Sequence, residues 1–208
     1  MTAIWGPLGW MTLHSVATSY PERPTPSEQV LMANWLDMFR DTITCPSCKG
    51  HFTEMLAAYR ARFPGMMQSR QEFALFSFRA HNAVNRRLHK PIYDTVDACM
   101  DTLKANLKTR TARDYRVSYI NHITRHWRTF QDVSGISALK KIVEMKKIED
   151  EYVFPRDTSF TVPLFPDIVV LPLGVLEKVE SSAGTTRRPA VRVPTRGLVL
   201  GPGGFRLR

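Results

Sequence analysis

The chain has 208 residues, of which 43% are hydrophobic, enough for one domain with a sizeable core plus a tail. No run approaches the ~18 apolar residues of a membrane span, and the N-terminus lacks the pattern of a secretory signal, so we expect a soluble, non-secreted protein. Three cysteines exclude a domain stapled by several disulfides. The net charge of +10 would suit nucleic acid or a membrane surface, although a solvated basic surface is the simpler interpretation.

Apolar residues at helical spacing, interrupted by proline and glycine, predict five helices in the first half of the chain. Their expected ranges are 8–20, 25–41, 46–63, 69–88 and 95–108. The connections between them are short, as in compact helical bundles. The predicted fold is therefore all-α, a four-helix bundle with a short fifth helix.

The second half of the chain has a different character. Helices are expected over 110–131 and 137–152, and the first places Tyr115, Tyr119, Ile123 and Trp127 at four-residue intervals. Such a ladder among basic residues could stack on single-stranded nucleic acid, but a packing face is the favoured interpretation. Recurring prolines then predict an extended arm, and the last segment contains no acidic residue, which predicts a disordered basic tail. The expected division is 1–108, 109–153, 154–180 and 181–208.

The segment Cys45-Pro46-Ser47-Cys48 stands where a loop is expected to become a helix. Two cysteines at this spacing can close a small, easily reduced ring, and a helix N-terminus favours the thiolate form. A half zinc site and two unrelated buried thiols are the competing interpretations. Zinc needs about four ligands and no second pair completes the set, so we expect no metal. A thioredoxin fold would require strands alternating with helices, which this sequence lacks.

A second group of chemically significant residues lies at 81–91. On a helix, His81, Asn85 and Leu88 share one face, and Asn82 lies beside Asn85. Buried polar groups at this density require partners. Opposite an aromatic cluster of Trp5, Trp10 and His14, they suit a bound heteroaromatic cofactor.

Four ordered motifs together resemble the Erv/ALR family of FAD-linked sulfhydryl oxidases. These are Trp5-Gly6-Pro7-Leu8-Gly9-Trp10-Met11-Thr12-Leu13-His14, Tyr20-Pro21 with Pro24-Thr25, Cys45-Pro46-Ser47-Cys48 with His51-Phe52, and His81-Asn82-Ala83-Val84-Asn85 with Leu88 and Lys90-Pro91. The resemblance covers about residues 4–100, and nothing past residue 108 takes part in it.

The resemblance implies a helical bundle that holds FAD non-covalently at its mouth, usually as a homodimer. Electrons from a thiol-containing protein or a thioredoxin-like carrier would enter the cysteine pair, pass to the flavin and leave to O2 as hydrogen peroxide. By motif, Cys48 would be the flavin-proximal thiolate and Cys45 the cysteine attacked by substrate. The positions that match cofactor contacts are Gly6, Pro7, Trp10, His14, His81, Asn82, Val84, Asn85, Leu88, Lys90 and Tyr93.

The departures from the family pattern are informative. A structural disulfide of many cellular members would join positions 78 and 95, which are Phe78 and Thr95 here, so packing by Phe78 is expected to replace it. Phe76 stands where the family commonly has tryptophan. The remaining thiol, Cys99, cannot form a shuttle disulfide alone and is expected in the core, with a bridge between subunits as the alternative interpretation.

These absences resemble the short members from large cytoplasmic DNA viruses. They imply that the enzyme works in the host cytoplasm or a virus factory on virion proteins, with packaging into the virion as a further option. Two alternatives remain open. One is a redox core whose main role is to bind nucleic acid or a virion component through the basic C-terminal half, and the other is an inactive member that keeps only the bundle.

Overall fold

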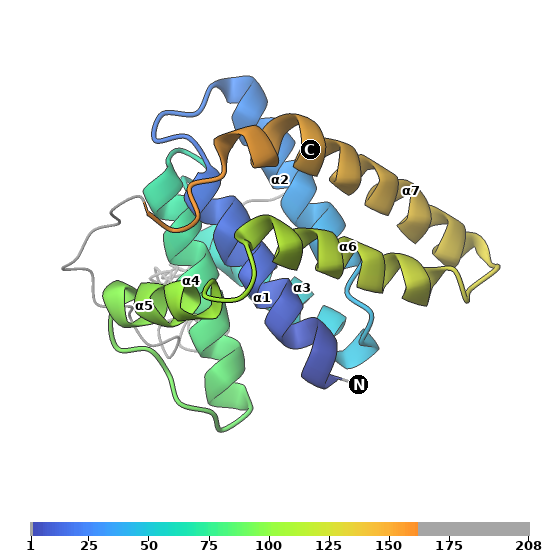
Figure 1. Cartoon of the computed structure of the whole chain (residues 1–208). Coiled ribbons are helices and arrows are strands. Elements are labelled where there is room, and N and C mark those ends of the chain that lie inside the picture. The colour runs from blue at the N-terminus through green and yellow to red at the C-terminus, as the bar shows by residue number, and fades with distance from the viewer. Residues whose placement is uncertain (1, 162–208) are drawn as a thin grey trace, which may run out of the picture.

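The computed structural model describes residues 2–161, which form seven α-helices and two short helical turns, with no strand in this range. The helices are α1 (Thr2–Ser19), α2 (Pro26–Asp41), α3 (Pro46–Arg62), α4 (Arg70–Arg87), α5 (Val96–Asn106), α6 (Ala112–Trp127) and α7 (Val133–Ile148). Helix α1 runs through the middle of the molecule, with α4 and α5 on one side and α6 and α7 on the other (Figure 1). The all-α prediction is confirmed. Within the described range, no helix is both long enough and apolar enough to cross a membrane.

Helix α1 begins at Thr2, six residues before the expected start at residue 8. The predicted start was wrong, because Pro7 lies inside the helix rather than before it. Pro7 is the sixth residue of α1, so it removes the hydrogen bond that its nitrogen would give to the Ala3 carbonyl, and the helix nevertheless continues to Ser19. The early start brings Gly6 and Pro7 onto the same helix as Trp10 and His14.

Side-chain caps fix where most of the other helices begin. The capping residues accept a hydrogen bond from the backbone two or three positions into the helix, and they are Thr25, Ser69, Thr95, Thr111 and Asp132. Each such cap is worth about 1 kcal/mol. At the start of α7, a Cβ on Gly135 would lie 2.1 Å from the carbonyl oxygen of Phe130, so only glycine fits this close approach.

One hydrophobic core joins the two halves of the chain. Buried residues from α6 and α7 belong to the same cluster as those from α1 to α4. Tyr119 and Ile123 of α6 are 0% exposed, and the indole Nε1 of Trp127 donates to the carbonyl of Thr42 at 2.9 Å. The interpretation of the aromatic ladder as a packing face is therefore confirmed.

A second, smaller cluster lies between α1, α4 and α5. It contains Phe78 of α4 and Cys99 of α5, both buried, together with Val96, which follows the capping Thr95. Cys99 is a free thiol in the core, as expected. Phe78 and Val96 thus join α4 to α5 by packing, close to positions 78 and 95, where the family resemblance would place a structural disulfide that this sequence lacks.

A buried ionic network fastens α6 to the end of the described chain. The Arg116 guanidinium, only 1% exposed, donates to Glu149 at 2.7 Å and to Asp157 at 2.8 Å, and it also bonds the Ser15 hydroxyl on α1. Glu149 opens a π-helical turn, Glu149–Val153, that continues α7. Charges buried at this depth are stable only when paired, so this network fixes the register of three segments.

Past the π turn, helical structure continues through Phe154–Arg156, where an extended arm had been expected from residue 154. Pro155 lies in the first turn of this 3-10 segment, a position that tolerates proline. The chain then folds back on α1, where Thr158 approaches Ser19 and Thr18 and Phe160 is buried. The rest of the expected arm and the tail at 181–208 lie outside the described residues.

Candidate functional site

Cys45 and Cys48 form a disulfide at the start of α3. Cys45 is the N-cap residue, Pro46 occupies the first turn, and the Cys45 sulfur accepts the backbone N–H of Cys48 at 3.3 Å. The helix forms here because proline at this position is preorganised and the sulfur takes the place of an ordinary capping oxygen. On reduction, both sulfurs would lie at the positive end of the helix, where a thiolate is stabilised.

Beside this disulfide lies a cavity of about 500 Å³, a size usual for small-molecule sites. Cys48 lines it, whereas Cys45 does not and has its sulfur 3.4 Å from the Ser47 hydroxyl near the surface. Nine of the eleven residues expected to contact the cofactor also line the cavity, namely Gly6, Pro7, Trp10, His81, Val84, Asn85, Leu88, Lys90 and Tyr93. The structure therefore gathers residues from three of the four sequence motifs around one hollow; the Tyr20-Pro21 and Pro24-Thr25 motif does not reach it.

His14 lies behind the cavity wall rather than on it. Its ring is fully buried, with Nδ1 at 2.8 Å from the Ser77 hydroxyl and Nε2 at 2.9 Å from Nδ1 of His81. The Ser77 hydroxyl donates to the Ala74 carbonyl at 2.7 Å, so its oxygen is left to accept a hydrogen bond from the Nδ1–H of His14. His14 then accepts from the Nδ1–H of His81, which leaves the Nε2 lone pair of His81 free.

Both histidines are neutral at physiological pH. Burial, and secondarily the neighbouring His81, holds the pKa of His14 well below its ordinary value. Burial, and secondarily Lys90, lowers the pKa of His81 to about 4. The His81 ring stacks on Trp10 with centroids 4.3 Å apart and planes 10° from parallel. The cavity wall thus presents an uncharged imidazole in a fixed orientation.

Asn82 also lies outside the cavity lining and holds a neighbouring segment in place. Its side chain exchanges two hydrogen bonds with the backbone of Tyr93, at 2.8 and 2.9 Å. The side-chain amide of Asn85 donates to the Pro91 carbonyl at 3.1 Å, and the backbone carbonyl of Asn85 accepts from the backbone N–H of Lys90 at 2.8 Å. Together the two asparagines hold the chain after α4 against that helix, so that Lys90 and Tyr93 reach the cavity.

The sequence did not single out every residue of the lining. Besides Trp5, which the sequence placed only in an aromatic cluster facing the cofactor, the residues it missed are Gly9, Met11, Phe39, Ile43, Phe52, Arg87, Thr102, Leu103 and Asn106. Gly9 and Met11 could have been found, because they lie in the same α1 motif as Trp10. The α5 residues carry no local signal, since only packing of that helix against α4 brings them to the cavity.

The residues around the cavity fit a flavin dinucleotide. The Trp5 indole N–H is buried without a hydrogen-bond partner in the protein, so a carbonyl or ring nitrogen of a ligand could accept from it. Aromatic side chains contribute to the lining beside aliphatic ones, namely Trp10, Phe39, Phe52 and Tyr93, and such faces suit a planar ring system. Arg87 and Lys90 supply positive charge suited to phosphates.

His14, His81 and Cys99 also form a compact group, with ligand-type atoms within 4.8 Å of one another. The two imidazole nitrogens that face each other are already joined by a hydrogen bond. Burial raises the pKa of the Cys99 thiol, so this sulfur is protonated. The sequence predicted no metal site, and this group is accounted for by hydrogen bonding and packing.

A dithiol–disulfide pair facing an aromatic cavity in a helical bundle defines a disulfide oxidoreductase with a planar redox cofactor. Residues 8–108 match the model of the Erv1 / Alr family. The chain belongs to this family, which binds FAD.

Three relatives illustrate the similarity. A putative FAD-linked sulfhydryl oxidase of Invertebrate iridescent virus 6 is 34% identical over 92 residues, 43% of this chain and 83% of the relative. Its counterpart in Invertebrate iridescent virus 3 is 34% identical over 42% of this chain and 58% of the relative. The mitochondrial FAD-linked sulfhydryl oxidase ERV1 of Saccharomyces cerevisiae is 36% identical over 43% of this chain and 45% of the relative. The matched region thus spans about half the length of the latter two relatives.

Proposed function

We propose that this protein is an FAD-dependent sulfhydryl oxidase that forms disulfide bonds. Substrate dithiols would be oxidised while the Cys45–Cys48 disulfide is reduced, and the two electrons would then go to FAD and on to O2, giving hydrogen peroxide. The observation that carries the proposal is that Cys48 lines the cavity beside Trp10 and His81 while it is disulfide-bonded to Cys45. The names of the relatives support the reaction type.

The two cysteines have different proposed roles. Cys45 is the sulfur attacked by the incoming thiolate, because it lies outside the cavity lining and beside the Ser47 hydroxyl near the surface. Cys48 leaves as the thiolate and faces the cavity, within the first turn of α3. FAD, when bound, supplies the two-electron acceptor and the reaction with oxygen.

The surrounding residues bind and orient the cofactor in this proposal. Trp10 and His81 present a stacked pair of rings, and the free Nε2 of His81 accepts a hydrogen bond without adding charge. Trp5 donates its unpartnered indole N–H. Asn82 acts as a positioning residue, since it holds Tyr93 rather than lining the cavity itself.

The decisive experiment is the visible spectrum of the purified protein, followed by oxygen consumption with dithiothreitol for the wild type and Cys48→Ser. A flavin spectrum with peroxide production that depends on Cys48 is expected. In Cys45→Ser, oxidation of protein dithiols should fall to background while the flavin spectrum is retained. Full turnover by Cys48→Ser, or a colourless protein that FAD does not reconstitute, would refute the proposal.

The physiological setting is proposed from the similarity to iridescent virus proteins. We place the enzyme in the host cytoplasm or virus factory, with packaging into the virion as a further option, acting on virion proteins directly or through a thioredoxin-like carrier. Immunolocalisation in infected cells tests this, and a purely mitochondrial signal would contradict it. A homodimer is also proposed, and light scattering of the purified protein decides it.

Binding of nucleic acid or a virion component through the basic C-terminal half is the second candidate function. Exposed basic residues of α6 favour it, such as Arg125 and Arg128. The aromatic ladder does not, because Tyr119 is buried in the core and cannot stack on bases. Salt-sensitive binding of a single-stranded oligonucleotide to the full chain would support this function.

A further inference from the structure

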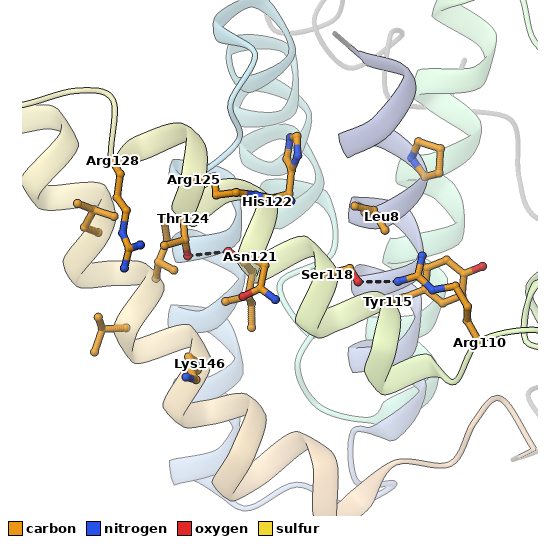
Figure 2. A pocket seen from close by; sticks show the side chains of 15 residues that line it. Leu8, Arg110, Tyr115, Ser118, Asn121, His122, Thr124, Arg125, Arg128 and Lys146 are labelled. Carbon is orange, nitrogen blue, oxygen red and sulfur yellow. Dashed lines mark hydrogen bonds between the residues drawn. The ribbon is translucent and has the colours of Figure 1, made fainter.

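A second hollow, larger than the cofactor cavity, lies along the outer face of α6 and has a volume of about 920 Å³ (Figure 2). We call it the α6 groove, and it is bounded by α7 on one side and by Pro7 and Leu8 of α1 on the other. In Figure 2, Arg128 and Lys146 lie at the α7 side and Arg110 lies near Leu8. The groove is therefore built largely from the half of the chain that the family motifs do not cover.

The charge of the α6 groove is entirely positive. Its lining contains Arg110, Arg125, Arg128 and Lys146, and no residue that lines it is acidic. Within residues 2–161, none of these four cations forms an ion pair, although other arginines of the protein do. Unpaired cations gathered in one concave site attract an anionic ligand.

The floor of the groove is aliphatic. Leu8, Leu139, Ile142 and Val143 line it, and Val143 is 70% exposed. The exposed stripe continues along α7 toward its N-terminus through Ile136, which is 52% exposed, and Val133, which is 84% exposed. The spacing of three and seven residues places these three side chains on one face of the helix. Exposed apolar rows of this kind mark sites of interaction with other molecules.

The combination of charge and apolar floor distinguishes among anionic ligands. Single-stranded nucleic acid binds through aromatic platforms, but the groove has one tyrosine, Tyr115, whose ring is covered by the Arg110 guanidinium at 4.5 Å. A membrane surface is flat and would not enter a concave hollow between two helices. An amphipathic helix supplies apolar anchors at three- and four-residue spacing with acidic residues beside them, which matches both features.

We propose that the α6 groove binds an acidic amphipathic helical segment of a thiol substrate protein. Pro7 lines both the groove and the cofactor cavity, so a protein held in the groove lies next to the site that Cys48 lines. That the partner is the thiol substrate rests on the proposed oxidase function. Binding of an acidic amphipathic segment in the groove is independent of that function, so the binding and the identity of the partner are tested in separate experiments.

The binding part is tested with full-length protein and a fluorescein-labelled peptide of about 18 residues, with leucines at helical spacing and glutamates elsewhere. The double variant Arg125→Glu with Lys146→Glu should weaken binding by about tenfold or more, because it reverses two charges of the groove. The matched control, Lys140→Glu with Lys147→Glu, makes the same change of charge on exposed positions outside the lining and should alter affinity less than about twofold.

An apolar substitution gives a second, independent measurement. Val143→Asp should weaken peptide binding by about tenfold, whereas Val30→Asp, at a 61% exposed position of α2, should not. Both positions are exposed, so both variants are expected to fold, and circular dichroism checks this. A peptide of the same composition with scrambled leucines should bind at least tenfold more weakly than the amphipathic one.

Three outcomes would overturn the binding part. These are equal affinity for the scrambled peptide, unchanged affinity in both groove variants, and tighter binding of an oligothymidine or of phosphatidylserine vesicles that displaces the peptide. The first would mean charge attraction alone. The second would place the peptide elsewhere, and the third would assign the groove to nucleic acid or lipid.

The substrate part is tested by joining the same amphipathic helix to a dithiol peptide. The Arg125→Glu with Lys146→Glu variant should raise KM for this substrate about tenfold, leave kcat unchanged, and leave dithiothreitol oxidation unchanged. An unchanged KM despite weakened peptide binding would refute the link to substrate delivery. Absence of dithiothreitol oxidation in the wild type would refute the oxidase proposal, while the binding measurement would still decide the nature of the groove.

Discussion

Two buried polar networks in this protein satisfy polar groups away from water in opposite ways. Around the cofactor cavity, His14, Ser77 and His81 form a chain of neutral hydrogen-bonded groups. At the junction with the C-terminal half, Arg116 is paired with Glu149 and Asp157, all largely removed from water. A neutral wall can face a ligand without imposing charge, whereas a closed ionic cluster fixes segments that have no ligand between them.

The largest expected effect comes from breaking the ionic network. Arg116→Met leaves two buried carboxylates without their partner, so the free energy of unfolding should fall by about 3–5 kcal/mol, as measured by urea denaturation. The triple variant Arg116→Met, Glu149→Leu, Asp157→Asn removes the charges together and should recover most of the loss. A triple variant as unstable as the single one would show that the network contributes packing rather than charge compensation.

The next largest effect on stability is expected in the apolar cluster that packs α5 against α4. Phe78 is 1% exposed in the cluster between α1, α4 and α5. Phe78→Ala should lower the free energy of unfolding by about 3 kcal/mol, because it leaves a cavity where many relatives are expected to have a disulfide. Phe78→Leu, which fills part of that volume, should cost less than half as much. Equal losses would mean that the aromatic ring has a role other than filling space.

A pH titration separates the neutral network from the ionic one. Unfolded histidines bind protons near pH 6.5, whereas the pKa of His81 in the folded protein is about 4 and that of His14 is also lowered. The unfolded state therefore binds more protons below about pH 6.5, and stability should fall from there toward pH 4 by on the order of 1 kcal/mol per pH unit for each histidine. Above pH 6.5 these groups contribute no slope.

Urea denaturation at several pH values in saturating FAD measures this slope. His81→Gln should flatten it by about half, since one of the two suppressed protonations is removed. His122, a half-buried histidine on α6 with a lowered pKa, offers a control, and His122→Gln should change the slope much less. A wild-type stability that does not fall between pH 6.5 and 5 would contradict the neutral assignment.

The smallest predicted effect tests the direction of the hydrogen-bond chain. Ser77→Ala removes the acceptor for the Nδ1–H of His14 and should cost about 1–2 kcal/mol of unfolding free energy. It should also release the tautomer of His81, which nitrogen NMR of labelled histidines can report. Ser77→Thr keeps a hydroxyl and should retain the wild-type tautomer. A wild-type spectrum with the proton on Nε2 of His81 would reverse the assigned direction.

The local elements of the redox half could be predicted from the residues alone. Helical periodicity and capping residues predicted α2 to α5 to within a few residues, because caps such as Thr25 and Ser69 act on their own first turns. The spacing of Cys45 and Cys48 was enough to predict a disulfide, since three residues on a helix bring the sulfurs together. The motif residues then fell around a single cavity.

The remaining features could not be predicted, because they depend on contacts between residues far apart in the chain. Arg116 reads as an ordinary basic helix residue until Glu149 and Asp157, 33 and 41 positions later, meet it in the core. The sequence predicts Asn82 as a cofactor contact, and the structure adds that its side chain holds the backbone of Tyr93, eleven residues later. The α6 groove exists only because two helices without a recognisable motif pack on α1 and α2, and packing of that kind leaves no periodic signal in sequence.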